Sequence, residues 1–273
     1  MAYNVTAKIQ EHYDLASPYY EKLWGQHIHH GYWITGKESK EVAAQNLIEL
    51  LIGKALLKPG SKVLDVGCGI GGTSMYLARK YNCDVTGITI SPIQVEMATK
   101  AASGLNISNK PKFLVDDANA ISVTGKFDVI WSVEMISHLR DRDNLFKRAS
   151  ELLKSGGKMC ITDWFQDENL SKQDLQKYIE PIEKGMLVSL PSLSEYNKYI
   201  DKYNFRLVYY EDISDQVART WDITSDAIKN RALWSLARSH SKEFIAFLQS
   251  FKAMRSGFKS GAFRYPALVL EKR

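Results

Sequence analysis

The feature that most constrains the fold of this 273-residue chain is a short apolar strand followed by a glycine-rich turn. The strand is Val63-Leu64-Asp65-Val66, and the turn is Gly67-Cys68-Gly69-Ile70-Gly71-Gly72. Because glycine has no β-carbon, the backbone can bend sharply here and a ligand can approach the N-terminus of the next helix. The pattern predicts a nucleotide-like ligand at the first strand–helix turn of an α/β sheet.

Short apolar runs alternate with helical patterns after this point, which predicts a parallel sheet with helices on both faces. The expected strands are 62–66, 84–90, 112–115, 127–132, 157–163, 205–213 and 265–272, and the expected helices include 39–57, 72–81, 92–103 and 143–154. We divide the chain, within one domain, into an N-terminal helical and aromatic lid segment (1–58), a ligand-binding core (59–165), and substrate-lid helices with the last two strands (166–273). Neither a repeat nor a proline-rich linker interrupts it.

Composition narrows the function classes. Lysine and arginine exceed aspartate and glutamate by 36 − 31 = 5 without a polybasic block, so nucleic acid binding is not implied. Cys68, Cys83 and Cys160 are far apart and not in a metal-binding spacing, which favours a reducing compartment and a core role. The N-terminus does not resemble a signal or transit peptide, and apolar stretches stay well short of the roughly 20 residues that span a bilayer. We expect a cytoplasmic protein without integral membrane association, and leave its oligomeric state open.

The glycine turn alone fits more than one ligand. Gly67, Gly69 and Gly72 also satisfy the G-x-G-x-x-G pattern of NAD-binding proteins. Two features argue against NAD. Asp65 lies inside the strand, where it could hold a cationic group or order the turn, and residues 89–91 lack the acidic side chain that binds the ribose of NAD.

Residues 63–71 resemble the first motif, V-L-D-x-G-C-G-x-G, of the class I S-adenosylmethionine (SAM)-dependent methyltransferases. The resemblance continues in order through residues 60–165, in the segments 85–94, 116–118, 127–134 and 152–158. It implies a Rossmann-like fold with a mostly parallel seven-stranded sheet and a helical lid. The sequence Gly-Ile-Thr-Ile-Ser-Pro at 87–92 is similar to a subset that includes tocopherol methyltransferases, natural-product sugar O-methyltransferases and cyclopropane synthases.

The resemblance also implies a cofactor site. Gly67 and Gly69 would contact the amino acid part of SAM through the main chain, with Asp65 nearby. Ile90 would lie against the adenosine, which Gln94 would reach, and Asp117 with Ala118 would face the adenine amino group. The predicted cofactor-binding residues are Asp65, Gly67, Gly69, Ile90, Gln94, Asp117, Ala118 and Glu134.

The segment 131–141 resembles the W-S-x-E-x-x-x-H-M-P-D pattern of the same subset and supplies a candidate catalytic base, His138. With an ordinary pKa of about 6.5, a histidine can accept a phenol, hydroxyl or ammonium proton near neutral pH. The alternative is a histidine that caps the loop after the strand.

Three closely spaced histidines, His27, His29 and His30, could suggest a metal site. However, they are not three or four residues apart as on one face of a helix, and no neighbouring carboxylate or cysteine completes a set of ligands. We therefore predict no metal. The segment 23–33 resembles one in tocopherol methyltransferases and alkaloid N-methyltransferases, and it is interpreted as a lid that excludes water. Packing of an N-terminal helix on the core is compatible with that role. The predicted lid residues are Tyr19, Trp24, His29, Tyr32 and Trp33.

The C-terminal third is rich in large apolar side chains, which fit either an apolar pocket for a ring or prenyl-like acceptor or an ordinary core. They are Met186, Leu187, Leu190, Tyr196, Tyr199, Trp221, Trp234, Phe244, Phe247, Phe251 and Met254.

The leading hypothesis is a SAM-dependent methyltransferase that acts on a hydrophobic small molecule, similar to the tocopherol methyltransferases, where a phenol activates a ring carbon and S-adenosylhomocysteine is released. An N- or O-methyltransferase of an alkaloid, amine or sugar-bearing natural product is the nearest alternative. An NAD(P)-dependent oxidoreductase and a catalytically silent SAM-binding module are alternatives from other classes.

Overall fold

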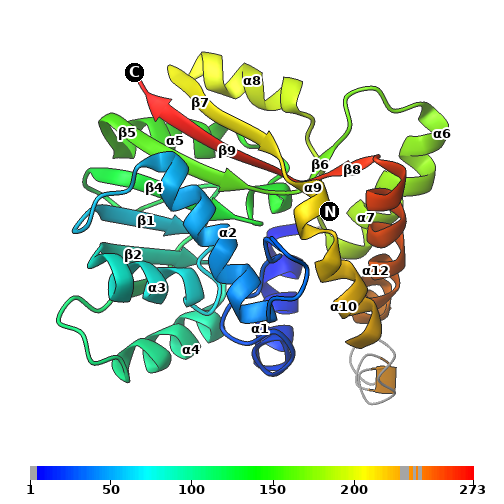
Figure 1. The fold of residues 1–273 in the computed structure, drawn as a ribbon, viewed down its shortest axis with the longest axis horizontal. Helices are drawn as coiled ribbons and strands as arrows, with labels where there is room; N and C mark the ends of the chain where they lie inside the picture. The colour runs from blue at the N-terminus through cyan, green and yellow to red at the C-terminus, as the bar shows by residue number, and fades with distance from the viewer. Residues whose placement is uncertain (1–4, 228–233, 236–237, 239–241) are drawn as a thin grey trace.

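The computed structural model describes residues 5–227, 234–235, 238 and 242–273. Its central feature is a seven-stranded sheet (Figure 1). The strand order is β3-β2-β1-β4-β5-β9-β7, and β9 runs antiparallel to both of its neighbours. The sheet is therefore mostly parallel, as predicted. Its strands are β1 (Lys62–Val66), β2 (Asp84–Thr89), β3 (Lys112–Val115), β4 (Phe127–Val133), β5 (Leu153–Thr162), β7 (Phe205–Asp212) and β9 (Pro266–Lys272), and β6 (Phe165–Gln166) pairs with β8 (Phe263–Arg264) separately.

Helices cover both faces of the sheet. Alternate residues of β1 face opposite sides: Val63 packs with α2 and α3, and Leu64 packs with α5 and α8. The long helices are α1 (Val5–Trp24), α2 (Lys40–Ala55), α3 (Gly72–Tyr81), α4 (Pro92–Ser103), α5 (Asp143–Leu152), α8 (Leu193–Lys202), α10 (Arg219–Ala227) and α12 (Lys242–Ser260). The shorter ones are η1 (Ile136–His138), α6 (Lys172–Asp174), η2 (Leu175–Ile179), α7 (Glu180–Met186) and α9 (Ser214–Val217).

Most helices and strands between residues 59 and 165 begin and end close to the predicted positions. The junction of α5 with β5 is different. The predicted helix reached residue 154, whereas α5 ends at Leu152 and β5 begins at Leu153. The reason is pairing, because Leu153 lies opposite Phe127 and the register then shifts before Val129. Residues 153–156, which precede the predicted strand 157–163, therefore belong to β5.

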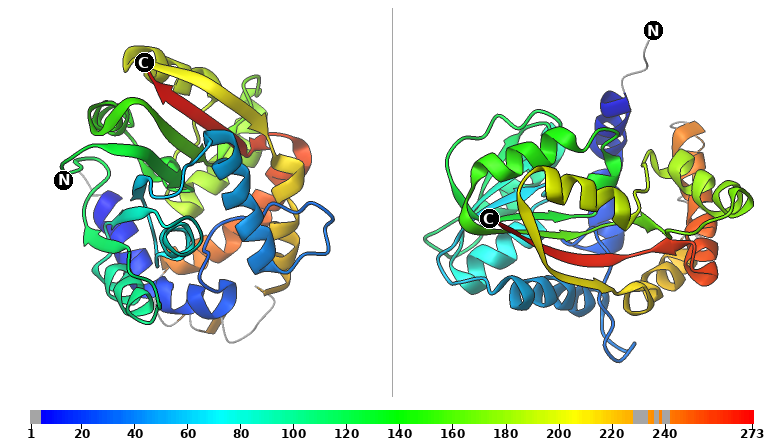
Figure 2. Two further views of the ribbon diagram at one scale, coloured as in Figure 1. Left: turned by 60° about the vertical axis from the view of Figure 1, so that its left-hand side comes forward. Right: turned by 90° about the horizontal axis from the view of Figure 1, so that it is seen from above.

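A second group of helices lies beyond the carboxyl ends of the parallel strands (Figure 2). Here α12 packs against α7 and α10, while α1 packs against α4. Helix α1 and the group formed by α7, α10 and α12 line cavities at this edge of the sheet. Open α/β sheets bind their ligands at the same edge. Within the described residues, no helix is both long and apolar enough to cross a bilayer.

Candidate active site

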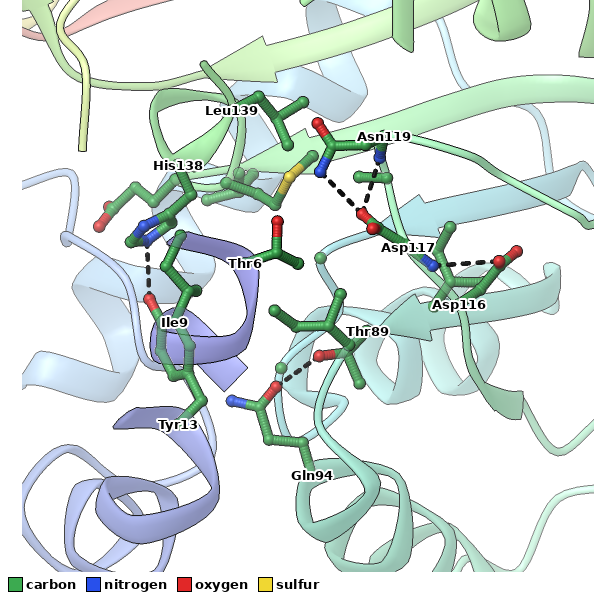
Figure 3. A pocket seen from close by; sticks show the side chains of 18 of the residues that line it. Thr6, Ile9, Tyr13, Thr89, Gln94, Asp116, Asp117, Asn119, His138 and Leu139 are labelled. Atoms are coloured by element: carbon green, nitrogen blue, oxygen red, sulfur yellow. Dashed lines mark hydrogen bonds between the residues drawn. The ribbon is translucent and has the colours of Figure 1, made fainter. Parts of the chain in front are cut away.

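A cavity lies between α1 and the ends of β1, β2 and β4, and it encloses about 810 Å³, counting space open to solvent (Figure 3). Strand ends supply Ile88, Thr89 and Val133, and α1 supplies Thr6, Ile9 and Tyr13. We call it the cofactor cavity. The predicted residues Gly67, Gly69, Ile90, Gln94, Asp117, Ala118, Glu134 and His138 all contribute to its wall.

The glycine turn has the conformation that its sequence predicts. Gly67 and Gly69 have φ angles of 82° and 53°, which favour glycine, and the Gly67 and Cys68 amides both donate to the Ile88 carbonyl. A β-carbon at Gly69 would meet no atom within 4 Å, so the space above it is open to a ligand. The turn thus forms a cradle that fits the amino acid part of SAM.

Asp65 lies beside this cradle in a smaller adjoining cavity that it shares with His27 and His29. Its Oδ2 accepts a hydrogen bond from the Ser74 hydroxyl at 2.6 Å, and its side chain is buried. Burial raises the pKa of Asp65 to about 6, while the Ser74 bond opposes the shift. The Ser74 bond joins Asp65 to the first turn of α3, directly after the glycine turn that Asp65 was expected to order.

The end of the cavity at which the sequence predicts the adenosine is polar. Asp117 Oδ1 accepts from both the main-chain and side-chain nitrogens of Asn119, at 2.9 and 2.8 Å (Figure 3). The Thr89 hydroxyl donates to Gln94 Oε1 at 2.6 Å, and Gln94 Nε2 donates to Ser17 of α1 at 3.0 Å. Both polar atoms of the Gln94 amide thus have protein partners, and Nε2 carries a second N–H that can donate to a ligand.

His138 and Tyr13 meet across the mouth of the cofactor cavity. The Tyr13 hydroxyl lies 2.9 Å from His138 Nε2. Burial lowers the pKa of His138 to about 4. A hydrogen bond with the main chain of Leu187 and the charge of Glu134 raise this pKa, but by less than burial lowers it. Burial also raises the pKa of Tyr13, so at neutral pH the pair is a neutral imidazole beside a protonated phenol.

Glu134 is an acidic residue that lies in the same cavity wall as Tyr13 and His138. Its residue adopts a left-handed conformation with φ of 52°, uncommon for a side chain other than glycine. Oε1 accepts from the His30 amide at 2.6 Å, from His30 Nδ1 at 2.9 Å and from the Tyr265 hydroxyl at 2.7 Å. Burial raises the pKa of Glu134, but the charge and hydrogen bonds of His30, together with the charge of His29, outweigh it and lower the pKa overall. The carboxylate is therefore ionised.

A second cavity, here called the acceptor cavity, adjoins the first. Its wall includes Trp164, Met186, Trp221 and Phe251, and it shares Tyr13, Ile28, Glu134 and His138 with the cofactor cavity. Met186, Trp221 and Phe251 come from the apolar set singled out in the C-terminal third. By contrast, Tyr196 and Tyr199 pack against Phe146 of α5, and the side chains of Phe244 and Phe247 lie outside the described residues.

The predicted lid residues divide into three groups. His29 contributes to both the acceptor cavity and the Asp65 cavity. Tyr32 packs against the core and Trp33 Nε1 donates to Thr220, so neither contributes to the walls of the three cavities. The side chains of Tyr19 and Trp24 lie outside the described residues. Within the described chain, no group of three or more histidines, cysteines or acidic residues is placed to hold a metal ion.

Sequence reasoning missed several residues at the site. Tyr13, Ile28, His30 and Trp164 were not proposed as site residues, although the first three lie in the aromatic and histidine-rich region before residue 34. Asn119 directly follows the predicted Asp117-Ala118 pair, a position that marked it as a neighbour. Trp164 carried no sequence signal beyond its place after β5.

The fold and the site define a class I SAM-dependent methyltransferase, an enzyme whose cofactor is SAM. The chain belongs to the mycolic acid cyclopropane synthetase family, which matches residues 3–265. It is 30% identical to a chloroplastic tocopherol O-methyltransferase from Arabidopsis thaliana, over 97% of this chain and 81% of the relative. It is 28% identical to the 27-O-demethylrifamycin SV methyltransferase of Amycolatopsis mediterranei (strain S699), over 90% and 91%. A mycolic acid cyclopropane synthase crystallised with S-adenosylhomocysteine has a TM-score of 0.85 at 21% identity, over 100% and 99% of the two chains.

Proposed function

We propose that this enzyme transfers the methyl group of SAM to a ring carbon of a lipophilic phenol. The observation that carries the proposal is the junction of the cofactor and acceptor cavities at Tyr13, Glu134 and His138. At this junction a methyl donor in one cavity and an acceptor in the other can be aligned, with a proton acceptor beside both.

The cofactor supplies a methyl group that is already activated on a positively charged sulfur. We infer that Asp65, Gly67 and Gly69 hold its amino acid end and that Ile90, Asp117 and Ala118 hold its adenosine end. Glu134, ionised beside both cavities, attracts the positive charge. The α1 side chains Thr6 and Ile9 close this cavity from outside and exclude water.

His138 acts as the base in this proposal. Its Nε2 receives the phenol proton either directly or through the Tyr13 hydroxyl, which is 2.9 Å away. The electron pair left on the oxygen enters the ring, and the ortho or para carbon forms the new carbon–carbon bond as the bond from sulfur to methyl breaks. That carbon then releases its own proton to solvent, which restores the aromatic ring. The protonated His138 returns its proton to the phenol oxygen, and S-adenosylhomocysteine leaves.

A second candidate is methylation of an amine nitrogen. The observation that favours it is the ionised Glu134 carboxylate in an aromatic cavity, a combination that also attracts ammonium groups. An amine must lose its proton before it can attack, so His138 would serve the same role.

The test is incubation with SAM carrying a deuterated methyl group and a panel of alkylated phenols, hydroquinones, alkaloid amines and sugars. Mass spectrometry reports which acceptor gains the label, and NMR of the product reports whether carbon, nitrogen or oxygen carries it. Label on a ring carbon supports the first candidate, label on nitrogen supports the second, and methylation of sugars alone contradicts both.

We further propose that the enzyme acts in the cytoplasm and does not bind nucleic acid.

A further inference from the structure

Asp163 directly follows β5 and joins this strand to two elements of the site. Its side chain is fully buried. Oδ2 accepts a hydrogen bond from the main-chain amide of Ser137 in η1 at 2.8 Å. Oδ1 accepts one at 2.7 Å from the main-chain amide of Trp164, a residue in the wall of the acceptor cavity. The two oxygens of one side chain thus bind the backbone of both elements.

Burying a carboxyl group lowers stability unless hydrogen bonds replace those that it makes with water. Main-chain amides that donate to a carboxylate form shorter and stronger hydrogen bonds than amides that donate to a neutral oxygen. The amide of Ser137 is therefore held at the carboxyl end of β5. Asp163 is not among the described residues that line the three cavities, so its effect on the site passes through the main chain.

The turn η1 is also held from a second side. The Ser137 carbonyl accepts a hydrogen bond from the Ser189 amide at 2.7 Å. Ser189 lies in the segment after α7, the helix that supplies Met186 to the acceptor cavity. Within the turn, the His138 amide donates to the Met135 carbonyl at 3.0 Å. The peptide groups on both sides of Ser137 are thus hydrogen-bonded, and the backbone position of His138 depends on these bonds.

His138 directly follows Ser137, and its Nε2 meets the Tyr13 hydroxyl at 2.9 Å where the two cavities join. A base must lie within a narrow range of distance and direction of the proton that it removes, and a displacement of about 1 Å can lower a rate roughly a hundredfold. Building on the proposed role of His138 as the base, we propose that Asp163 is a positioning residue. Its carboxylate holds the Ser137 amide and thereby fixes His138 Nε2 beside Tyr13.

Asp163→Ala, which removes both acceptor oxygens, tests this role without turnover. The ring centroids of Tyr13 and His138 lie 5.6 Å apart, close enough for a nuclear Overhauser effect (NOE) between their ring protons. In enzyme saturated with S-adenosylhomocysteine, this NOE should weaken in the variant, while calorimetry should give an unchanged affinity for S-adenosylhomocysteine. Asp163→Asn keeps one of the two acceptors, so its effect should be smaller. It takes the place of the alanine variant if that variant does not fold.

The kinetic test uses the acceptor that gains label from SAM in the panel described above. Asp163→Ala should lower kcat roughly tenfold and leave KM for this acceptor unchanged, because only the base is displaced. In the His138→Ala background, adding Asp163→Ala should not lower kcat further, since Asp163 acts through the imidazole. Damage to the acceptor wall at Trp164 would instead raise KM or persist in that background.

Asp128→Ala is the matched control. Asp128 Oδ2 also accepts from a main-chain amide, that of Lys62 at 2.9 Å, and Oδ1 pairs with Lys154 at 2.6 Å. The residue lies near the start of β4, however, and does not line the three cavities. Its variant should keep the wild-type NOE and kcat.

A wild-type NOE or a wild-type kcat in Asp163→Ala, or the same loss of kcat with and without His138, overturns this inference alone. Wild-type kcat in His138→Ala overturns the role of the base and this inference together. If no phenol in the panel gains label, the proposed function fails, and the NOE decides whether Asp163 positions His138.

Discussion

Tyr13 of α1 and His138 of η1 are 125 residues apart in the sequence, and their side chains meet at 2.9 Å between Oη and Nε2. The contact joins the N-terminal helix to the turn after β4 at the junction of the two cavities. It joins the histidine that the sequence predicts as a candidate base to Tyr13, a partner that the sequence did not indicate.

We expect His138→Ala to lower the turnover number roughly a hundredfold, because the base is removed. The affinity for S-adenosylhomocysteine, measured by calorimetry, should change little. Tyr13→Phe should lower turnover by a smaller factor, since His138 Nε2 is still present. If the double variant is no slower than His138→Ala, the two residues act on the same proton; turnover unaffected by His138→Ala would assign that histidine a structural role.

The dependence of kcat/KM on pH tests the environment of His138. Because burial lowers its pKa to about 4, the free enzyme holds the imidazole in its basic form well below pH 6. The acid limb of the profile should therefore lie near pH 4–5 instead of near the ordinary histidine value of about 6.5. An acid limb at 6.5 that is lost in His138→Ala would contradict this buried, neutral state.

Replacing Asp65 should separate stability from cofactor binding. Its raised pKa, about 6, means that the folded protein holds a proton more tightly than the unfolded chain, so this carboxyl lowers stability as pH rises from about 4 to 6 and remains unfavourable above. Asp65→Asn should raise the melting temperature of the free protein at pH 8 by a few degrees, and by less at pH 5. SAM affinity should fall, because the substitution removes a negative charge beside the ammonium group of the cofactor's amino acid end. A lower melting temperature at pH 8 would instead mean that the Ser74 hydrogen bond stabilises the fold by more than burial of the Asp65 charge destabilises it.

Glu134→Gln tests recognition of the positive sulfur. Glutamine keeps an oxygen for His30 and Tyr265 but removes the charge. SAM affinity should fall roughly tenfold and S-adenosylhomocysteine affinity by less, since only SAM carries the charge. Tyr265→Phe, which removes one donor and leaves the carboxylate, should keep the ratio of the two affinities. Equal losses for both ligands in Glu134→Gln would show that the carboxylate serves only to position its neighbours.

A β-carbon at Gly72 would lie 2.1 Å from the Gln26 carbonyl oxygen and 2.9 Å from His27 Nδ1. Gly72→Ala should therefore displace the segment 26–27 from the glycine turn and weaken SAM binding, as followed by calorimetry. Gly53→Ala is the control, because a β-carbon there meets nothing within 4 Å, and it should stabilise α2 by about 0.5–1 kcal/mol without affecting the cofactor. Wild-type SAM affinity in Gly72→Ala would mean that segment 26–27 does not contribute to the cofactor site.

The sequence by itself determined the core of this protein. The apolar strand 63–66, the glycines after it and the alternation of strands and helices are local patterns, and they predicted the bounds of β1, α3, α4 and β3 as observed. Asp65, Gly67 and Gly69 follow from the same turn, because backbone conformation at a glycine depends mainly on neighbouring residues.

Only the tertiary structure decided how the two cavities meet. Tyr13, His30 and Trp164 come from separate segments. The contacts of Tyr13 with His138, of His30 with Glu134 and of Trp164 with His30 depend on how α1 and the C-terminal helices pack over the sheet. Such packing arises from long-range burial of apolar surface, which no local pattern encodes.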